Sequence, residues 1–166
     1  MREGARARRG TIGRMTLRRM DHVGIVVDDL AAAMAFFSEL GLERQGEWSA
    51  EDERVDRIVG LEGVRTDMAM MQTPDGAARV ELVKFRSPSG GDGDGQGDAP
   101  ANAPGLRHLA FLVDDVDRVL AGLRRCGAEL VGDVLRYGDT YRLCYVRGPA
   151  GIIIELAEEV GAGAAG

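Results

Sequence analysis

The sequence predicts an α+β fold built from two tandem βαβββ modules that form one shared, curved mixed sheet. The main observation is a repeat. The two histidines of the chain, His22 and His108, begin two similar segments, His-Val-Gly-Ile-Val-Val-Asp-Asp-Leu and His-Leu-Ala-Phe-Leu-Val-Asp-Asp-Val. The same offset of 86 residues continues without a gap to Gly41 and Gly127. A constant offset that extends this far beyond the repeated segments indicates two related structural units.

The composition supports two small modules with a common core. The chain has 166 residues, of which 45% are apolar and 29% are charged, as in soluble globular proteins. It lacks the roughly 20 consecutive apolar residues of a membrane helix, and its basic segment 1–14 lacks the apolar middle region of a secretory signal. We therefore expect a cytoplasmic protein without membrane contacts. The net charge of −6 opposes phosphate backbones, which argues against a nucleic-acid partner.

The first module is expected to span residues 18–86. A short β-branched run predicts its first strand. Apolar residues at three- and four-residue steps, with Asp28 or Asp29 as N-cap and Gly41 at the end, predict a helix after it. Pro74-Asp75-Gly76 predicts the turn of a hairpin. The expected elements are a strand at 19–27, a helix at 30–40, a strand at 42–48, a short helix at 52–59 and hairpin strands at 66–73 and 78–85.

The second module repeats this plan over residues 106–158. Its helix is expected to end at Gly127, and its hairpin is expected to turn at Gly148-Pro149-Ala150-Gly151. The expected elements are a strand at 107–113, a helix at 116–126, a strand at 129–133 and hairpin strands at 140–146 and 152–157.

The remaining segments are expected to be flexible. Residues 87–105 contain few apolar side chains that repay the entropy of ordering, which predicts a flexible Gly/Asp/Pro linker. Residues 1–17 are expected to form a disordered basic tail and residues 159–166 a flexible tail. The linker residues Asp92, Asp94 and Asp98 resemble a calcium loop, but Ala103 stands where such a loop has its bidentate glutamate, which argues against calcium.

Each module places one histidine at the head of its first strand and one glutamate in its last strand. The pairs are His22 with Glu81 and His108 with Glu155. The glutamates lie in Val-Glu-Leu-Val and Ile-Ile-Ile-Glu-Leu, and a carboxylate among such apolar neighbours persists only with a cation or a metal as its partner. If the sheet curls around a central cavity, the two imidazoles and the two carboxylates converge on one metal ion.

Taken singly, each of these four residues has a simpler explanation. A lone histidine on an apolar strand is more often a hydrogen-bonded core residue, and a lone strand glutamate often pairs with an arginine. Four such residues at equivalent positions of two copies favour a metal centre. The mixed nitrogen and oxygen donors suit one divalent ion, which we expect to be Zn, Ni, Co, Mn or Fe(II), and leave positions open for water or substrate.

These motifs resemble the vicinal oxygen chelate superfamily, which includes glyoxalase I, methylmalonyl-CoA epimerase, extradiol dioxygenases, fosfomycin-resistance proteins and bleomycin-binding proteins. The matching pieces are residues 20–28, residues 106–114 and the two Glu-Leu strands that follow Pro-x-Gly turns. The resemblance covers about residues 18–158. It implies paired βαβββ units, a small-molecule substrate, a homodimer, and metal ligands at His22, Glu81, His108 and Glu155.

The resemblance to glyoxalase I implies a lyase or isomerase that abstracts a proton next to a metal-bound carbonyl or hydroxyl of the substrate. We expect Glu155 to be the base and Glu81 to be the partner acid/base. Such chemistry is compatible with a thiol cosubstrate. Epimerases and fosfomycin-type enzymes fit less well, because they usually have another residue type in place of Glu81.

Two further classes of function stay open. A ring-cleaving Fe(II) extradiol dioxygenase would use His22, His108 and Glu155, but such enzymes commonly recruit a further histidine for proton transfer, and the chain has none. A non-catalytic binding protein of the bleomycin-resistance type would need none of the four ligands.

Several other side chains are expected near the cavity without a catalytic role. They include two tyrosines, Tyr141 and Tyr145, that alternate with Arg142 along one strand. Ordinary sheet packing already explains that alternation. Trp48 and Met70 are likewise expected to have a packing role and no catalytic role.

Overall fold

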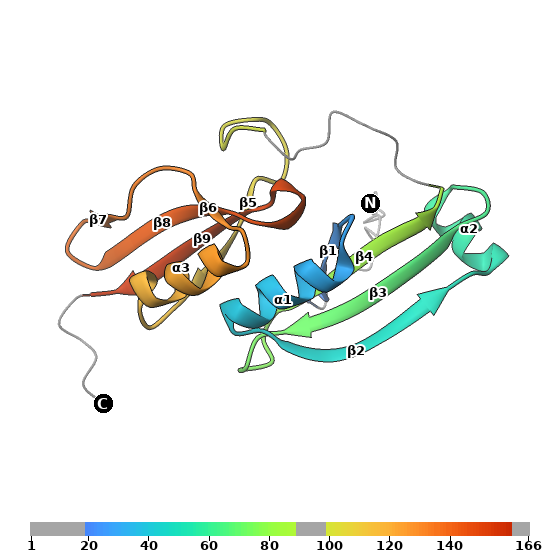
Figure 1. The fold of residues 1–166 in the computed structure, drawn as a ribbon, viewed down its shortest axis with the longest axis horizontal. Coiled ribbons are helices and arrows are strands. Elements are labelled where there is room, and N and C mark those ends of the chain that lie inside the picture. Colours follow the sequence, from blue (N-terminus) through green and yellow to red (C-terminus); the bar gives the residue numbers. More distant parts are fainter. Residues whose placement is uncertain (1–18, 89–98, 161–166) are drawn as a thin grey trace, which may run out of the picture.

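The computed structural model describes residues 19–88 and 99–160. In this part of the chain two modules lie next to each other, with their helices close together (Figure 1). The expected tail 1–17 and residues 161–166 of the expected tail 159–166 lie outside the described residues, whereas Glu159 belongs to the last strand. Most of the expected linker, including the aspartates that resemble a calcium loop, also lies outside the described residues.

Module one forms a four-stranded sheet. Its strands are arranged in the order β1-β4-β3-β2, with β1 parallel to β4 and the other neighbours antiparallel. Strand β1 therefore lies at one edge of this sheet and pairs only with β4. The elements are β1 (Val23–Val26), α1 (Leu30–Leu40), β2 (Glu43–Ala50), α2 (Glu53–Val59), β3 (Arg65–Gln72) and β4 (Arg79–Ser87).

Module two repeats this topology with shorter strands. Its sheet has the order β5-β9-β8-β6, with β5 parallel to β9 and with β7 added along β8. The edge strand β5 thus matches β1 of the first module. The elements are β5 (His108–Leu112), α3 (Val116–Arg125), β6 (Glu129–Leu130), β7 (Leu135–Tyr137), β8 (Tyr141–Arg147), a 3-10 turn η2 (Pro149–Gly151) and β9 (Ile153–Glu159).

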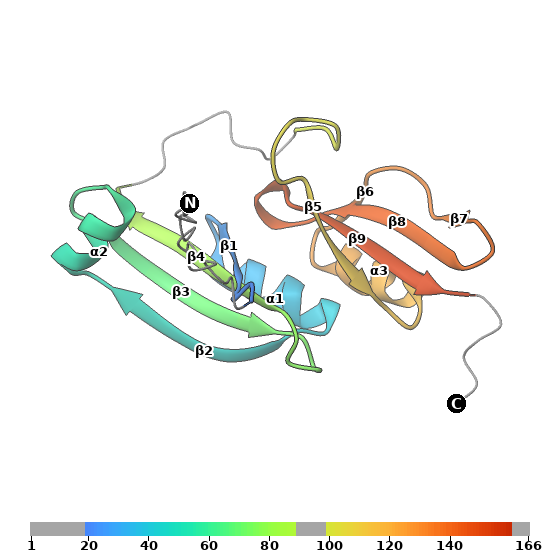
Figure 2. The same cartoon turned by 180° about the vertical axis from the view of Figure 1, so that it is seen from behind.

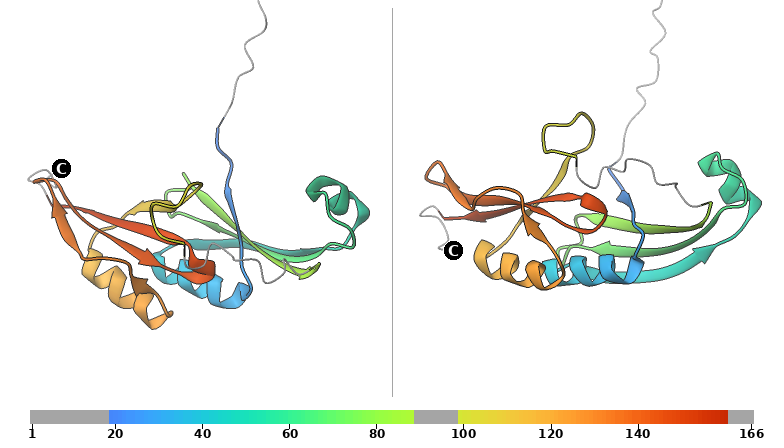
Figure 3. Two further views of the ribbon diagram at one scale, coloured as in Figure 1. Left: turned by 90° about the horizontal axis from the view of Figure 1, so that it is seen from above. Right: turned by 45° about the horizontal axis from the view of Figure 1, so that its top comes forward.

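The predicted α+β class with two βαβββ modules is confirmed, but each module has its own sheet instead of sharing one. The edge strands β1 and β5 do not pair with each other. The modules are joined instead through α1 and α3, which pack against each other. Figure 2 shows the two sheets from the side away from these helices. Figure 3 shows α1 and α3 together on one side of the sheets, with α2 on the other side.

Helix α1 begins and ends where the sequence predicts, and α3 begins as predicted but ends at Arg125, one residue before the predicted end at 126. Asp29 caps α1 by accepting a hydrogen bond of 2.9 Å from the backbone N–H of Ala32, and Asp115 caps α3 in the same way. Gly41 ends α1 with a φ of 111°, a left-handed conformation that glycine adopts without strain. These caps fix the direction in which each helix leaves its first strand.

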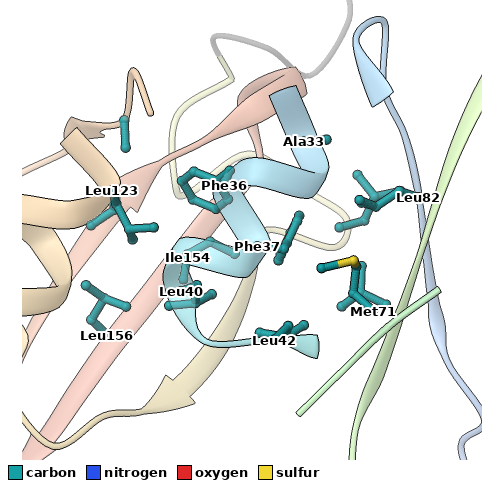
Figure 4. Packing of buried hydrophobic residues seen from close by; sticks show 14 of the residues in the cluster. Ala33, Phe36, Phe37, Leu40, Leu42, Met71, Leu82, Leu123, Ile154 and Leu156 are labelled. Carbon is teal, nitrogen blue, oxygen red and sulfur yellow. The ribbon is translucent and has the colours of Figure 1, made fainter. Parts of the chain in front are cut away.

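The core is common to both modules (Figure 4). Phe36 and Phe37 of α1 are fully buried and meet edge to face, with ring centroids 5.3 Å apart. Phe36 also lies against Gly148 of module two, where a Cβ atom would come within 2.7 Å of the ring. This close approach fixes the position of the first module relative to the second, because the tightly packed ring has no room to move aside.

Two elements of module two were not predicted from the sequence. Strand β7 has only three residues, all of them exposed, and is too short for alternation to predict a strand. The turn at Gly148-Pro149-Ala150-Gly151 was predicted, but its 3-10 form was not. In the described residues, no helix is long and apolar enough to cross a membrane.

Candidate metal centre

Strand alternation divides each sheet into a helix-facing side and an open side. In module one, the buried Ala69 and Leu82 are paired neighbours on the side of α1. Their chain neighbours Met70 and Glu81, also paired, therefore point to the open side. The same alternation in module two buries Leu156 and places Glu155 on the open side.

The first predicted pair is brought together on the open side of module one. Parallel pairing sets Gly24 of β1 beside Glu81 of β4, so His22, two residues earlier, points to the same side as this carboxylate. The Nε2 atom of His22 lies 3.5 Å from Oε2 of Glu81. Both side chains are partly exposed, 36% for His22 and 21% for Glu81.

The second pair repeats this arrangement in module two. Ala110 of β5 pairs with Glu155 of β9, which directs His108 and Glu155 to the same side. The distance from His108 Nε2 to Glu155 Oε2 is 3.2 Å, and the exposed fractions are 39% and 21%. Two equivalent His–Glu pairs thus lie on the open sides of the two sheets.

The two pairs do not meet within one chain. Across residues 19–88 and 99–160, no group of three or more His, Cys, Asp or Glu side chains is close enough to hold a metal ion. The separation follows from the fold, because each pair belongs to its own sheet and the sheets are joined through α1 and α3. Convergence of all four side chains on one ion therefore stays a prediction.

His22 has a charged partner on its second ring nitrogen. Its Nδ1 atom lies 3.0 Å from Oδ2 of Asp21, and Asp21 also forms ion pairs with Arg79 and Arg19. The hydrogen bond with His22 lowers the pKa of Asp21, as do the charges of the two arginines. A carboxylate at Nδ1 fixes the tautomer that leaves Nε2 as an acceptor, which is the form that binds metals.

The second pair has an aromatic partner instead. Tyr145 of β8 lies opposite Glu155 of β9, and its ring centroid is 5.1 Å from that of His108. Burial raises the pKa of Tyr145, and so do the charge of Glu155 and a hydrogen bond with it. From its sequence alternation, Tyr145 was expected to serve ordinary packing. The hairpin register, counted outward from the Gly148–Gly151 turn, is the signal that pairs it with Glu155.

An apolar row runs beside each His–Glu pair on the open side of the sheet. In both modules the row crosses the sheet from the edge strand and includes exposed side chains, among them Val26 (58%), Trp48 (41%) and Leu112 (65%). The row of module one consists of Val26, Val83, Met68 and Trp48, and that of module two of Leu112, Ala157, Leu143 and Leu135.

The donor set of the two pairs fits a divalent metal ion. Imidazole nitrogen and carboxylate oxygen suit Zn, Mn, Fe(II), Co and Ni. In the described part of the chain, the only ion-pair partner of Glu81 is His22 and that of Glu155 is His108. Each pair therefore offers one nitrogen and one oxygen donor that are not engaged by an arginine or a lysine.

A family comparison confirms the resemblance inferred from the sequence. The family described as the Glyoxalase/Bleomycin resistance protein/Dioxygenase superfamily matches residues 21–145. The crystal structure of a glyoxalase family protein from Bacillus cereus is 44% identical in sequence, covers 91% of this chain and 100% of its own, and superposes with a TM-score of 0.85.

More distant proteins are also similar to this chain, in sequence or in fold. The protein YwbC of Bacillus subtilis is 28% identical over 142 residues, which are 84% of this chain and 96% of YwbC. The structure of the fosfomycin resistance protein FosX from Listeria monocytogenes, in complex with Mn(II) and a dihydroxypropylphosphonic acid, is 15% identical with a TM-score of 0.55. It covers 89% of this chain and 93% of its own.

Proposed function

The chain belongs to the glyoxalase/bleomycin resistance protein/dioxygenase superfamily, and on that premise we propose that it is a divalent-metal-dependent lyase or isomerase of the glyoxalase type. It moves a proton at the carbon next to a carbonyl or hydroxyl oxygen of a small substrate. The observation that carries the proposal is the repeated His–Glu pair, with Nε2 and Oε2 atoms 3.5 Å apart in module one and 3.2 Å apart in module two. A cytoplasmic location and a thiol cosubstrate stay predictions.

The proposed centre is completed by a second copy of the chain. Catalytic metal sites with such donors usually take three protein ligands or more, whereas each pair supplies two. The shared core, with Phe36 locked against Gly148, keeps the two pairs of one chain on separate sheets. In a homodimer, the first pair of one copy meets the second pair of the other.

The free edges of the sheets support this dimer. In the described structure β1 pairs only with β4 and β5 only with β9, so each has an unpaired edge that a second copy can occupy. A cleft of about 510 Å³ lies at these edges and is lined by both strands, including Val23, Val26 and His108.

The roles of the four residues follow from their positions. His22, His108, Glu81 and Glu155 would hold the ion, which when bound supplies Lewis-acid polarisation of the substrate oxygen. Glu155 is the proposed base that takes the proton from the neighbouring carbon, and Glu81 is the partner that returns it. The hydroxyl of Tyr145 orients the carboxylate of Glu155. The carboxylate of Asp21 orients the imidazole of His22.

Mixing two inactive double variants tests the centre and its origin from two copies. His22→Ala/Glu81→Gln destroys the first pair, and His108→Ala/Glu155→Gln destroys the second. If the centre joins two copies, each heterodimer regains one intact site, and an equimolar mixture should recover about a quarter of wild-type activity and metal content. No recovery after subunit exchange, with a dimer shown by light scattering, contradicts the shared centre. Full metal content in either double variant alone contradicts the ligand set.

A ring-cleaving Fe(II) dioxygenase is the second candidate, and Tyr145 is the observation that favours it. The sequence offers no third histidine for proton transfer, but the phenol of Tyr145 lies beside both His108 and Glu155. Oxygen consumption with catechol by the Fe(II)-loaded protein would support this reaction. Turnover of a hemithioacetal without oxygen uptake would support the glyoxalase type.

A further inference from the structure

We propose that the oxygen-bearing carbons of the substrate carry an uncharged aromatic group, which packs on the apolar row beside Glu81. This proposal rests on the metal centre proposed above and adds the class of substrate. The row consists of Val26, Val83, Met68 and Trp48, and each member is paired with the next across the strands β1, β4, β3 and β2.

The row lies next to the proposed ligand Glu81. Met70 is the cross-strand neighbour of Glu81, and Met68 follows it on the same side of β3. Trp48 lies two strands across the sheet and two residues along it from Glu81, which corresponds to about 12 Å at the usual strand spacing and rise. A ring attached directly to the oxygen-bearing carbons packs on the two methionines, between the carboxylate and the indole.

The side chains of the row suit an aromatic group. Thioether sulfurs make favourable contacts with aromatic rings, and an indole stacks on aromatic rings in offset or edge-to-face arrangements. Trp48 is 41% exposed and is the only tryptophan of the chain. An exposed indole at the end of an apolar row is not buried in the core, and its surface is available to line a ligand site.

Two arginines that alternate onto the open sides are already engaged, which disfavours an anionic group beside them. Arg79 alternates onto the open side of module one, but it is already bound to the carboxylate and the backbone oxygen of Asp21. Arg147 in module two donates hydrogen bonds to the backbone oxygens of Gly151 and Ala99. A phosphonate or carboxylate on the substrate would have to displace these acceptors, whereas a neutral ring displaces only water.

Three matched ligands test the proposal on the zinc-loaded full-length protein. Hydroxyacetone supplies the vicinal oxygens alone, 2-hydroxyacetophenone adds a neutral ring, and 4-(hydroxyacetyl)benzoate adds a ring with a negative charge. We expect isothermal titration to give 2-hydroxyacetophenone about tenfold tighter binding than either of the others, the scale of one aromatic contact. Equal affinity for hydroxyacetone, or a preference for the benzoate, overturns the proposal.

Variants locate the preference on the row. Trp48→Ala should remove most of the tenfold preference and leave zinc affinity and hydroxyacetone binding unchanged, while Trp48→Phe should keep most of it. Leu61→Ala is the control, because Leu61 is similarly exposed (44%) but lies after α2, outside the row. A preference that survives Trp48→Ala contradicts the assignment.

A protein that binds no zinc contradicts the metal centre itself, whereas intact zinc binding without a ring preference contradicts only the class of substrate.

Discussion

The two modules build the same His–Glu pair but support it in different ways. In module one, the carboxylate of Asp21 contacts Nδ1 of His22 and forms an ion pair with Arg79. In module two, Tyr145 lies against both His108 and Glu155. The position of Tyr145 opposite its glutamate is occupied in module one by Met70. Duplication therefore fixes the donor atoms through strand register, whereas the residues around each pair differ between the two modules.

Replacement of the two glutamates should give the largest difference between the modules. Glu155→Gln keeps the shape of the side chain but removes the proposed base, so we expect kcat/KM to fall by about 10² to 10⁴. Glu81→Gln should cost less, because the partner acid/base acts after the proton has been abstracted. Steady-state kinetics at matched metal content measures both. A larger loss from Glu81→Gln would reverse the two roles.

Asp21→Asn should weaken metal binding by about 10-fold to 100-fold, the usual effect of losing a carboxylate behind a ligating histidine. The expected cause is loss of the charged acceptor at Nδ1 of His22. Competition with a chelator measures the affinity. Glu47→Gln is the matched control, because Glu47 pairs with Arg44 on the side of α1. Equal weakening by both variants would show a general charge effect instead.

Tyr145→Phe should lower kcat by about tenfold while metal content stays unchanged, because a hydrogen bond to a charged group contributes at least about 1.5 kcal/mol. Tyr137→Phe should leave kcat unchanged, since Tyr137 is 73% exposed in β7. The two variants are compared under saturating substrate. Loss of metal in Tyr145→Phe would instead indicate that the ring supports His108 and the centre as a whole.

The smallest expected effect is on the pH dependence of stability and concerns α2. This helix follows the second strand of module one, where module two has β7 instead. Asp52 caps α2 and pairs with Arg54, which lowers the pKa of Asp52 from 3.8 to about 2. Because the folded pKa lies below the ordinary value, this contribution to stability is present above pH 3.8 and is lost as the pH falls towards 2. Urea midpoints between pH 6 and pH 2 should therefore fall slightly less steeply in Asp52→Asn. Identical slopes would show that Asp52 does not contribute.

Local signals predicted most of the fold, and the repeat predicted the candidate donors. The N-cap Asp29, the stop at Gly41 and the hairpin turns act over a few residues, so the sequence reveals them directly. The repeated His–Glu pairs are also a local result, since strand register places each pair. The separation of the two sheets was not predictable, because it depends on Phe36 fitting against Gly148, a contact between distant segments. Tyr145 was missed because its alternation with Arg142 is also what ordinary packing produces.

The central claim is that the two pairs hold one ion together, and anomalous scattering from cobalt-loaded crystals tests it most directly. We predict one peak per chain, at about 2.0 to 2.2 Å from Nε2 of His22 and an oxygen of Glu81 in one copy and from Nε2 of His108 and an oxygen of Glu155 in its partner. A peak that contacts one pair alone, or that lies away from both pairs, would contradict the account.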